Sequence, residues 1–219
     1  MGNKKKHSTR NILFVILSVA IFGILILSGY LGVKINGLYY LMDNTGKKYS
    51  LEITQDPNPY TVQINLDSLE SNYGKELYNQ NGASIVIERV YKKSIINSES
   101  QQYIVQFHSN PNYSSSQGLF VSFLLRNYGD DTSVISSFTQ SHAKCKIQYH
   151  GKEYDPLLVT SDKGDQFIEY ALFNQQAIQD GALRNPNGTI TFIVSDLTKY
   201  NWTRKQIFLH SYNNITPWN

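Results

Sequence analysis

The chain begins with one long hydrophobic run and continues with short segments in which hydrophobic and polar residues alternate. Residues 12–33 form a stretch of 22 residues without a charge. As an α-helix this stretch would be about 33 Å long, close to the roughly 30 Å hydrocarbon core of a lipid bilayer. The pattern therefore predicts a transmembrane helix at 12–33, preceded by a short cytoplasmic tail at 1–11.

The residues around this run predict how it is placed in the membrane. Three lysines at 4–6 and Arg10 precede it, so the positive-inside rule puts the N-terminus in the cytoplasm and the later chain outside. The run closes with "LILSGY" (25–30), where a lipoprotein signal would have a cysteine in place of Tyr30. Without that thiol no lipid can be attached, and the residues before Tyr30 fit a cleavage site poorly. We expect an uncleaved, single-pass signal anchor in the plasma membrane rather than a cleaved signal peptide.

Downstream of residue 48, hydrophobic residues recur at every second position, which is typical of β-strands with one buried face. The runs that show this alternation are Tyr60–Leu66, Tyr103–Phe107, Leu119–Leu125, Cys145–Tyr149, Ile190–Val194 and Ile207–Leu209. There is no internal repeat and no change of composition along this region. Many short strands of this kind predict one antiparallel β-sandwich domain, which we place at 49–219.

Two further segments complete the predicted plan. Residues 34–48 contain turn signals, and we expect them to form a juxtamembrane linker. Residues 165–181 fit a short helix that begins after Asp165 and ends at Gly181, or else a strand followed by a loop. The predicted fold class is therefore mainly β: an N-terminal transmembrane helix followed by an antiparallel β-sandwich, with room for one short helix.

Three segments of the predicted domain follow one another in a characteristic order. "GLFVSFLLRNYGDDTSVISS" (118–137) holds two predicted strands around a Gly-Asp turn, and "KIQYHGKEYDP" (146–156) and "NGTITFIVSD" (187–196) come after it. This order resembles the immunoglobulin-like, telokin-like extracytoplasmic domains of small membrane-anchored surface proteins of Gram-positive bacteria, over about residues 80–212. The resemblance implies an immunoglobulin-like sandwich with a binding or structural role, and it transfers no site residues.

Composition supports a folded domain and limits the class of partner. Hydrophobic residues make up 41% of the chain and charged residues 17%, which suits a globular protein. The net charge is +3, but four of the 20 basic residues lie within positions 1–10 and no acidic residue precedes Asp43. Residues 34–219 therefore carry 16 basic and 17 acidic residues. Nucleic-acid binding needs a strongly basic face, so we expect no nucleic-acid partner.

Residue types that bind metals are present, but their spacing does not favour a site. The histidines beyond the hydrophobic run are His108, His142, His150 and His210. No HxH or HxxxH pair occurs among them, whereas a zinc site needs three or four converging ligands. Asp130 and Asp131 follow a glycine in a sequence typical of a turn. We expect neither a metal nor a cofactor.

Nucleophilic catalysis is not indicated either. The chain has no GxSxG and no SxxK motif. Cys145 is the only cysteine, and it alternates with Lys144 and Lys146 on a predicted strand. We expect its side chain to face the core as a buried, unreactive thiol. The prediction is that the protein is not an enzyme.

Aromatic residues are the remaining candidates for a binding site. In "YNWTRKQ" (200–206), Trp202 lies between two predicted strands and is close to Tyr200 and Arg204. Tyr, Trp and Arg are the residues that most often anchor a partner at an interface. We therefore predict these three residues as a partner-binding surface, with packing in the core as the competing interpretation.

Together these features predict a membrane-anchored, non-catalytic binding module that is displayed outside the plasma membrane. Its partners would be the membrane, through residues 12–33, and a protein or glycan of the cell envelope. A scaffold subunit of a secretion or conjugation machine is one alternative, which a helix curled against a sheet would favour. A cell-envelope enzyme is another, which would need a cleft that gathers some of His108, His142, His150, Asp130, Asp131 and Glu153. An immunity protein against an exported toxin is a third.

Overall fold

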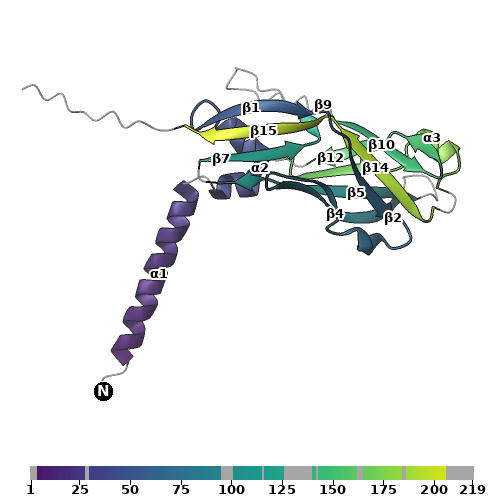
Figure 1. Cartoon of the computed structure of the whole chain (residues 1–219). Helices are drawn as coiled ribbons and strands as arrows, with labels where there is room; N and C mark the ends of the chain where they lie inside the picture. The colour runs from purple at the N-terminus through teal and green to yellow at the C-terminus, as the bar shows by residue number, and fades with distance from the viewer. Residues whose placement is uncertain are drawn as a thin grey trace, which may run out of the picture.

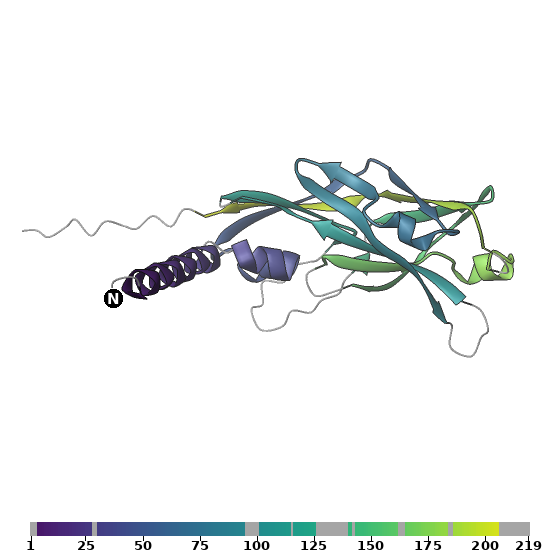
Figure 2. The same ribbon diagram turned by 90° about the horizontal axis from the view of Figure 1, so that it is seen from below.

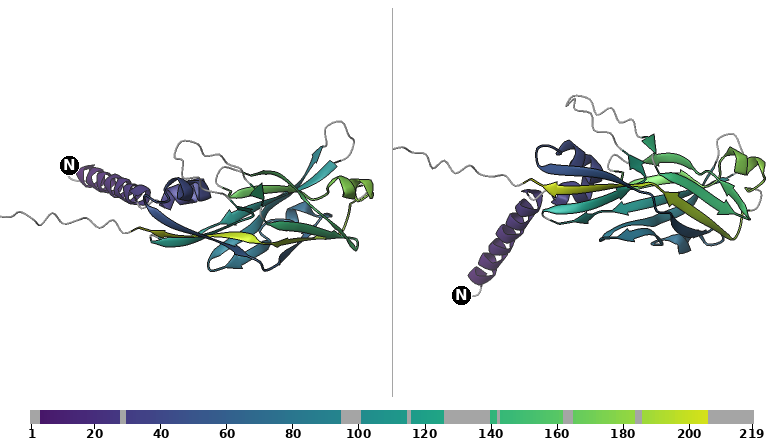
Figure 3. Two further views of the ribbon diagram at one scale, coloured as in Figure 1. Left: turned by 90° about the horizontal axis from the view of Figure 1, so that it is seen from above. Right: turned by 45° about the horizontal axis from the view of Figure 1, so that its top comes forward.

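The structure of the protein is a computed structural model. It describes residues 4–27, 30–94, 101–114, 116–125, 140–141, 143–161, 165–183 and 186–205. Helix α1 (Lys4–Leu27) projects away from a β-rich domain, and α2 (Tyr30–Asp43) lies against that domain (Figure 1). Views from below and from above show the same arrangement (Figures 2 and 3).

Antiparallel sheets build the domain. Sheet A has the strand order β1 (Tyr49–Asp56), β15 (Leu197–Arg204), β7 (Gln117–Ser122) and β6 (Asn112–Tyr113). Sheet B has the order β11 (Lys152–Tyr154), β10 (Lys144–Tyr149), β14 (Thr189–Ser195) and β2 (Tyr60–Asn65). Sheet C has the order β12 (Leu157–Ser161), β13 (Phe167–Ala171), β5 (Gln101–Asn110), β4 (Ala83–Ser94) and β3 (Glu76–Gln80). The smaller elements are the strand pair β8 (Leu124–Leu125) and β9 (Gln140–Ser141), the 3-10 helix η1 (Leu69–Asn72) and the short helix α3 (Gln175–Gln179).

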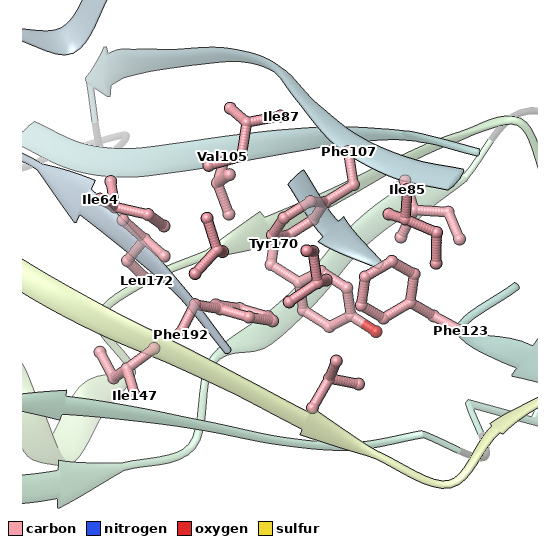
Figure 4. Packing of buried hydrophobic residues seen from close by; sticks show 14 of the residues in the cluster. Ile64, Ile85, Ile87, Val105, Phe107, Phe123, Ile147, Tyr170, Leu172 and Phe192 are labelled. Carbon is pink, nitrogen blue, oxygen red and sulfur yellow. The ribbon is translucent and has the colours of Figure 1, made fainter. Parts of the chain in front are cut away.

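Sheets B and C enclose the main hydrophobic core (Figure 4). The ring centroid of Phe192 on β14 lies 5.0 Å from that of Phe107 on β5 and 5.7 Å from that of Tyr170 on β13. Burial of such large aromatic side chains is the main source of stability in a domain of this size. The prediction of a mainly β protein with antiparallel, sandwich-like sheets is confirmed, and the alternating residues supply the inner faces.

Within sheet A, strand β7 is buried on both faces. On β7, Val121 faces the main core, whereas Phe120 beside it faces α2. From α2, Leu38 and Leu41 are fully buried against this second face. A strand covered on both faces needs hydrophobic residues at consecutive positions, which explains the run "LFVSFLL" (119–125), in which Ser122 is the one polar residue. Residues 34–48, which we expected to be a linker, thus contain a helix that belongs to the domain core.

The transmembrane helix predicted at 12–33 is not supported. Within the described ranges, no helix is long and apolar enough to cross a membrane. The predicted segment is divided between α1, which ends at Leu27, and α2, which begins at Tyr30. The backbone of α2 then turns at Gly37, with φ 49° and ψ −132°, and continues into the domain. The α2 residues that are fully buried against sheet A, Leu38 and Leu41, come after this run.

The region 165–181 holds a strand and then a short helix. The strand agrees with the second of the two interpretations, but a helix stands where that interpretation has a loop. Its strand, β13, pairs with β5 and β12 in sheet C. Helix α3 begins after Asn174, whose side-chain oxygen accepts a hydrogen bond of 2.9 Å from the Ala177 amide. Asp165 is buried, has φ 53°, and does not cap this helix. The strand predicted around Ile207–Leu209 lies outside the described residues.

We predict that Leu41→Ala lowers the free energy of unfolding by about 2–5 kcal/mol, because it opens a cavity between α2 and sheet A. Ile35→Ala is the matched control on the same helix, since Ile35 is 67% exposed, and it should change stability by less than about 0.5 kcal/mol. Urea unfolding in a mild detergent measures both. Equal effects of the two variants would contradict the assignment of α2 to the core.

Candidate functional site

The three residues predicted to bind a partner do not form a surface. All three lie within strand β15, not in a loop between strands. Tyr200 and Trp202 are 0% and 1% exposed, and the Tyr200 hydroxyl donates a hydrogen bond of 2.8 Å to the Leu124 carbonyl. Arg204 ends the strand with an exposed side chain. The interpretation of the two aromatic residues as partner anchors is therefore corrected: they are core residues.

Trp202 holds the second face of sheet A together. Its ring lies 5.4 Å from the Tyr49 ring in a T-shaped contact and 5.0 Å from the Tyr113 ring. At Gly118, on the adjacent strand, a Cβ would clash with the Trp202 ring and with the Asn112 carbonyl. The glycine therefore allows the indole to lie flat on the sheet. The sequence could not show this packing, because α2 was not expected here.

The titratable residues singled out in the sequence do not converge. His108 stacks on Phe167 at 4.3 Å between ring centroids, and its Nδ1 lies 3.5 Å from Glu88. His150 lies in the turn after β10, with its ring 4.1 Å from that of Tyr149. His142, His210, Asp130 and Asp131 lie outside the described residues. Among the residues that are described, no group of three or more His, Cys, Asp or Glu side chains could hold a metal ion.

Cys145 is a partly buried thiol that packs against the main core. Burial raises its pKa to about 12, against a smaller opposing effect of a hydrogen bond with Tyr170. A thiol with so high a pKa is almost fully protonated at neutral pH and is a poor nucleophile. Its environment is the one expected for a structural cysteine.

A buried ion pair joins β1 and β15, two neighbouring strands of sheet A. Asp56, at the end of β1, is 3% exposed, and its Oδ2 lies 2.6 Å from Nζ of Lys199 on β15. The Tyr60 hydroxyl donates a second hydrogen bond of 2.7 Å to Oδ2, and the Asn58 backbone and side chain both donate to Oδ1. The Lys199 ammonium also lies 5.7 Å from the centre of the Tyr78 ring. The sequence pattern gave no signal for this cluster, because its members lie on four strands, β1, β2, β3 and β15.

The charges in this cluster are stabilised rather than poised for proton transfer. Burial by itself would raise the pKa of Asp56, but the hydrogen bonds from Lys199, Tyr60 and Asn58 outweigh it and hold that pKa at about 2. Burial, followed by the bond to Asp56, raises the pKa of Tyr60 to about 12. A general acid or base works best with a pKa near the ambient pH. This cluster therefore fixes the turn between sheets A and B instead of supporting catalysis.

The outer face of sheet C presents a mixture of charged and aromatic side chains. We call Glu88, Arg89, Tyr91, His108 and Phe167 the sheet C face. Arg89 places its guanidinium 4.9 Å from the centre of the Tyr91 ring and 3.4 Å from Oε1 of Glu169. The Arg89 side chain is 59% exposed, so most of it is accessible to a partner. Arg and Tyr are the residue types that dominate protein interfaces.

A β-bulge places Arg89 on this face. The register between β4 and β5 shifts between Ile87 and Arg89, so that Arg89 stands opposite Gln106. Without the extra residue, strict alternation from the buried Ile85 and Ile87 would direct position 89 into the core. Bulges often redirect a side chain at a functional surface. The ion pair with Glu169, which is 8% exposed, then keeps the guanidinium in place.

Helix α1 is the most unusual surface of the molecule. Large hydrophobic residues between Ile12 and Ile24 are 51–73% exposed, with Phe14 the most exposed. Six consecutive residues of this set, 12–17, cover every side of the helix, because one turn takes 3.6 residues. A helix that is hydrophobic all round is normally buried in a protein core or in a membrane.

Comparison with known proteins gives no relative: no protein-family model, no curated protein and no solved structure matches this chain. Functional inference therefore depends on the geometry described above.

We predict that the buried ion pair makes stability depend on pH at low pH. The folded pKa of Asp56, about 2, lies below its ordinary value of 3.8. The carboxylate therefore stabilises the fold above pH 4, and this contribution of about 2 kcal/mol is lost as the pH falls through 2. Urea unfolding at pH 7, 4 and 2.5 measures it. Asp56→Asn should reduce stability at pH 7 by about 3 kcal/mol and flatten the profile in this window.

Asp155→Asn is the control for this prediction. Asp155 also forms an ion pair, with Lys146 at 2.7 Å, but its side chain is 66% exposed. Exposed pairs contribute little, so this variant should keep the wild-type profile within about 0.5 kcal/mol. Parallel pH profiles for the wild type and Asp56→Asn would show that Asp56 does not carry the effect.

Proposed function

We propose that the protein is a membrane-attached, non-catalytic interaction module, in which α1 inserts into a lipid bilayer and the β-sandwich presents a surface to a partner. The observation that carries the proposal is the exposure of apolar side chains on every side of α1. Each exposed large side chain would gain about 1.5–3 kcal/mol on complete burial in an apolar environment. This gain is large enough to make an isolated, water-exposed α1 an improbable resting state.

Lipid fits α1 better than a protein groove does. A helix that docks in a groove presents one apolar face, with anchors three or four residues apart, and keeps its other face polar. In α1 the exposed apolar set includes the neighbours Leu13, Phe14 and Val15, which point in different directions. The basic residues at 4–6 and Arg10, at the start of the helix, suit the phosphate groups of a bilayer surface. Crossing of the bilayer by residues 12–33, with the N-terminus in the cytoplasm, stays a prediction from the sequence.

The sheet C face is the partner surface that we propose for the domain. It combines a partly exposed arginine, a tyrosine and a stacked His108–Phe167 pair with the acidic Glu88. Such a mixture can bind an envelope protein or glycan through stacking and directional hydrogen bonds. We place this face outside the plasma membrane, in line with the predicted orientation.

A scaffold subunit was expected to show a helix curled against a sheet in place of stacked sheets. The structure has both features, because sheets B and C enclose one core while α2 packs on the second face of sheet A, so the fold does not decide against this alternative. An enzyme was expected to gather His108, His150 and Glu153, but His108 contacts Glu88 and Phe167 in sheet C, while Glu153 accepts a hydrogen bond from Gln148 in sheet B. An immunity role would use the same kind of surface. The resemblance to telokin-like domains stays a prediction.

We predict that the full chain floats with lipid vesicles in a density gradient and that Ile16→Asp/Val19→Asp abolishes most of this flotation. Each aspartate near the middle of a lipid-embedded helix costs about 2.5–3.5 kcal/mol. The matched control is Ile53→Asp/Tyr73→Asp, which replaces two exposed hydrophobic residues of the domain. This control should float like the wild type. Loss of flotation in both variants, or in neither, would refute the role of α1.

We predict that a photo-crosslinking residue at Tyr91 captures a discrete partner in cells that express the full chain. A crosslinker at Tyr73 serves as the control, because Tyr73 is 71% exposed and is not part of the sheet C face. It should give no discrete adduct. Arg89→Ala should reduce the yield at position 91 by roughly tenfold, because loss of an interface hot spot costs about 1–2 kcal/mol. A yield at position 91 that is unaffected by Arg89→Ala would argue against the sheet C face.

A further inference from the structure

Four basic side chains gather at one end of sheet A, and we call them the basic rim: Lys47, Lys48, Arg204 and Lys205. All four are exposed. The antiparallel register pairs Tyr49, the first residue of β1, with Arg204, the last residue of β15, so the two chain segments meet at this end. The Lys205 amide donates a hydrogen bond of 2.8 Å to the Lys48 carbonyl, which extends the pairing beyond the strands.

The turn that carries two of these lysines is tightly held. Gly46 has φ 81°, and its amide donates a hydrogen bond of 2.9 Å to the Tyr49 carbonyl. The Asn44 side chain donates to the Tyr40 carbonyl in α2, and the Lys48 amide donates to the Asn44 carbonyl, each at 2.9 Å. Nζ of Lys205 donates a bond of 2.7 Å to the Gly46 carbonyl. The cations are therefore presented by an ordered turn, and a ligand need not order it.

The basic rim lies at the end of the domain where α1 leaves it. The turn directly follows α2, whose last residue is Asp43, and α2 follows α1 after two residues. Figure 1 shows the near end of α1 beside the tip of β15 and the start of β1, and Figure 2 shows the same neighbourhood from below. With α1 in a bilayer, this end of the domain is the one closest to the lipid headgroups.

Charge is concentrated at this end. Residues 34–219 carry 16 basic and 17 acidic residues in total. The basic rim and its neighbour Asp43 together have a charge of +3, which leaves 12 basic and 16 acidic residues for all other positions from 34 onward. The domain is thus acidic on average and basic at the end next to α1. This distribution complements a negatively charged surface placed at that end.

We infer that the basic rim binds the anionic headgroups of the same bilayer that holds α1. The inference rests on the membrane attachment proposed above, and it adds the chemistry of the lipid: phosphodiester headgroups with a net negative charge. A Lys or Arg side chain near an anionic bilayer contributes roughly a fivefold factor to binding. A hydrophobic anchor combined with a basic patch is a common pair of signals for stable attachment. Continuity with α1 favours lipid over a soluble polyanion.

The test uses the full chain in vesicles and measures how fast an amine-reactive acylating reagent modifies each lysine, by peptide mass spectrometry. Neutral phosphatidylcholine vesicles are compared with vesicles in which about 30% of the lipid is phosphatidylglycerol. We expect Lys47 and Lys48 to react roughly fivefold more slowly on the anionic vesicles. Lys92 and Lys93, exposed on β4, are the internal control and should react equally on both. Salt at about 0.5 M should remove the protection.

A pair of variants separates the basic rim from general charge. R204Q/K205Q removes two of its cations and keeps Lys47 and Lys48 as reporters, so their protection should fall to about twofold or less. K92Q/K93Q removes the same charge from β4 and should leave the protection unchanged. Thermal unfolding identifies a variant that has lost its fold, and in that case K205Q alone replaces R204Q/K205Q.

The outcomes distinguish this inference from the proposed function. Equal reactivity of Lys47 and Lys48 on neutral and anionic vesicles, with the protein still floating, overturns the inference and leaves membrane attachment standing. Failure to float overturns both. Protection of the same two lysines by inorganic polyphosphate without vesicles, equal to that by anionic lipid, overturns the assignment to a bilayer and indicates a soluble polyanion.

Discussion

The burial of α2 against the second face of sheet A is the contact on which the rest of the structure depends. Strand β7 has one face in the main core and the other under α2, so its hydrophobic residues are all buried only when both layers are present. Leu38 and Leu41 supply the cover from α2, and Phe120 and Tyr200 receive it from the sheet. Because α2 follows α1 almost directly, the same contact fixes where the exposed apolar helix leaves the domain.

The alternating segments of the sequence predicted strands, but the sequence did not predict that a helix covers the second face of sheet A. Alternation along segments such as Ile190–Val194 follows directly from one buried face, and the structure has strands there. The helix α2 was missed because the turn signals within residues 34–48 predicted a linker, and the sequence alone does not distinguish hydrophobic residues of a linker from residues that pack in a core. That distinction depends on contacts with β7 and β15, which come from distant positions in the chain.

At the candidate site too, residue types in the sequence were not enough to predict which side chains are exposed. Trp202 and Tyr200 have the composition of a binding anchor, yet aromatic residues are just as suitable for a core, and burial decides between the two roles. Arg89 gave no sequence signal, because its exposure depends on a bulge in the pairing of β4 with β5. The ion pair of Asp56 with Lys199 joins residues far apart in the chain, so spacing could not reveal it.

Two buried titratable groups among the described residues are each held in one protonation state. Asp56 has a pKa held low by its hydrogen bonds, and Cys145 has a pKa raised by burial, so each is stabilised in the form that does not transfer a proton at neutral pH. Glu169 accepts hydrogen bonds from Arg89 and Gln106 within one sheet. The features that stand out on the surface are the apolar residues of α1 and the exposed cations at the adjacent end of sheet A. Desolvation of apolar surface and neutralisation of charge can both be achieved at a lipid surface, so the attachment that we propose would account for both features.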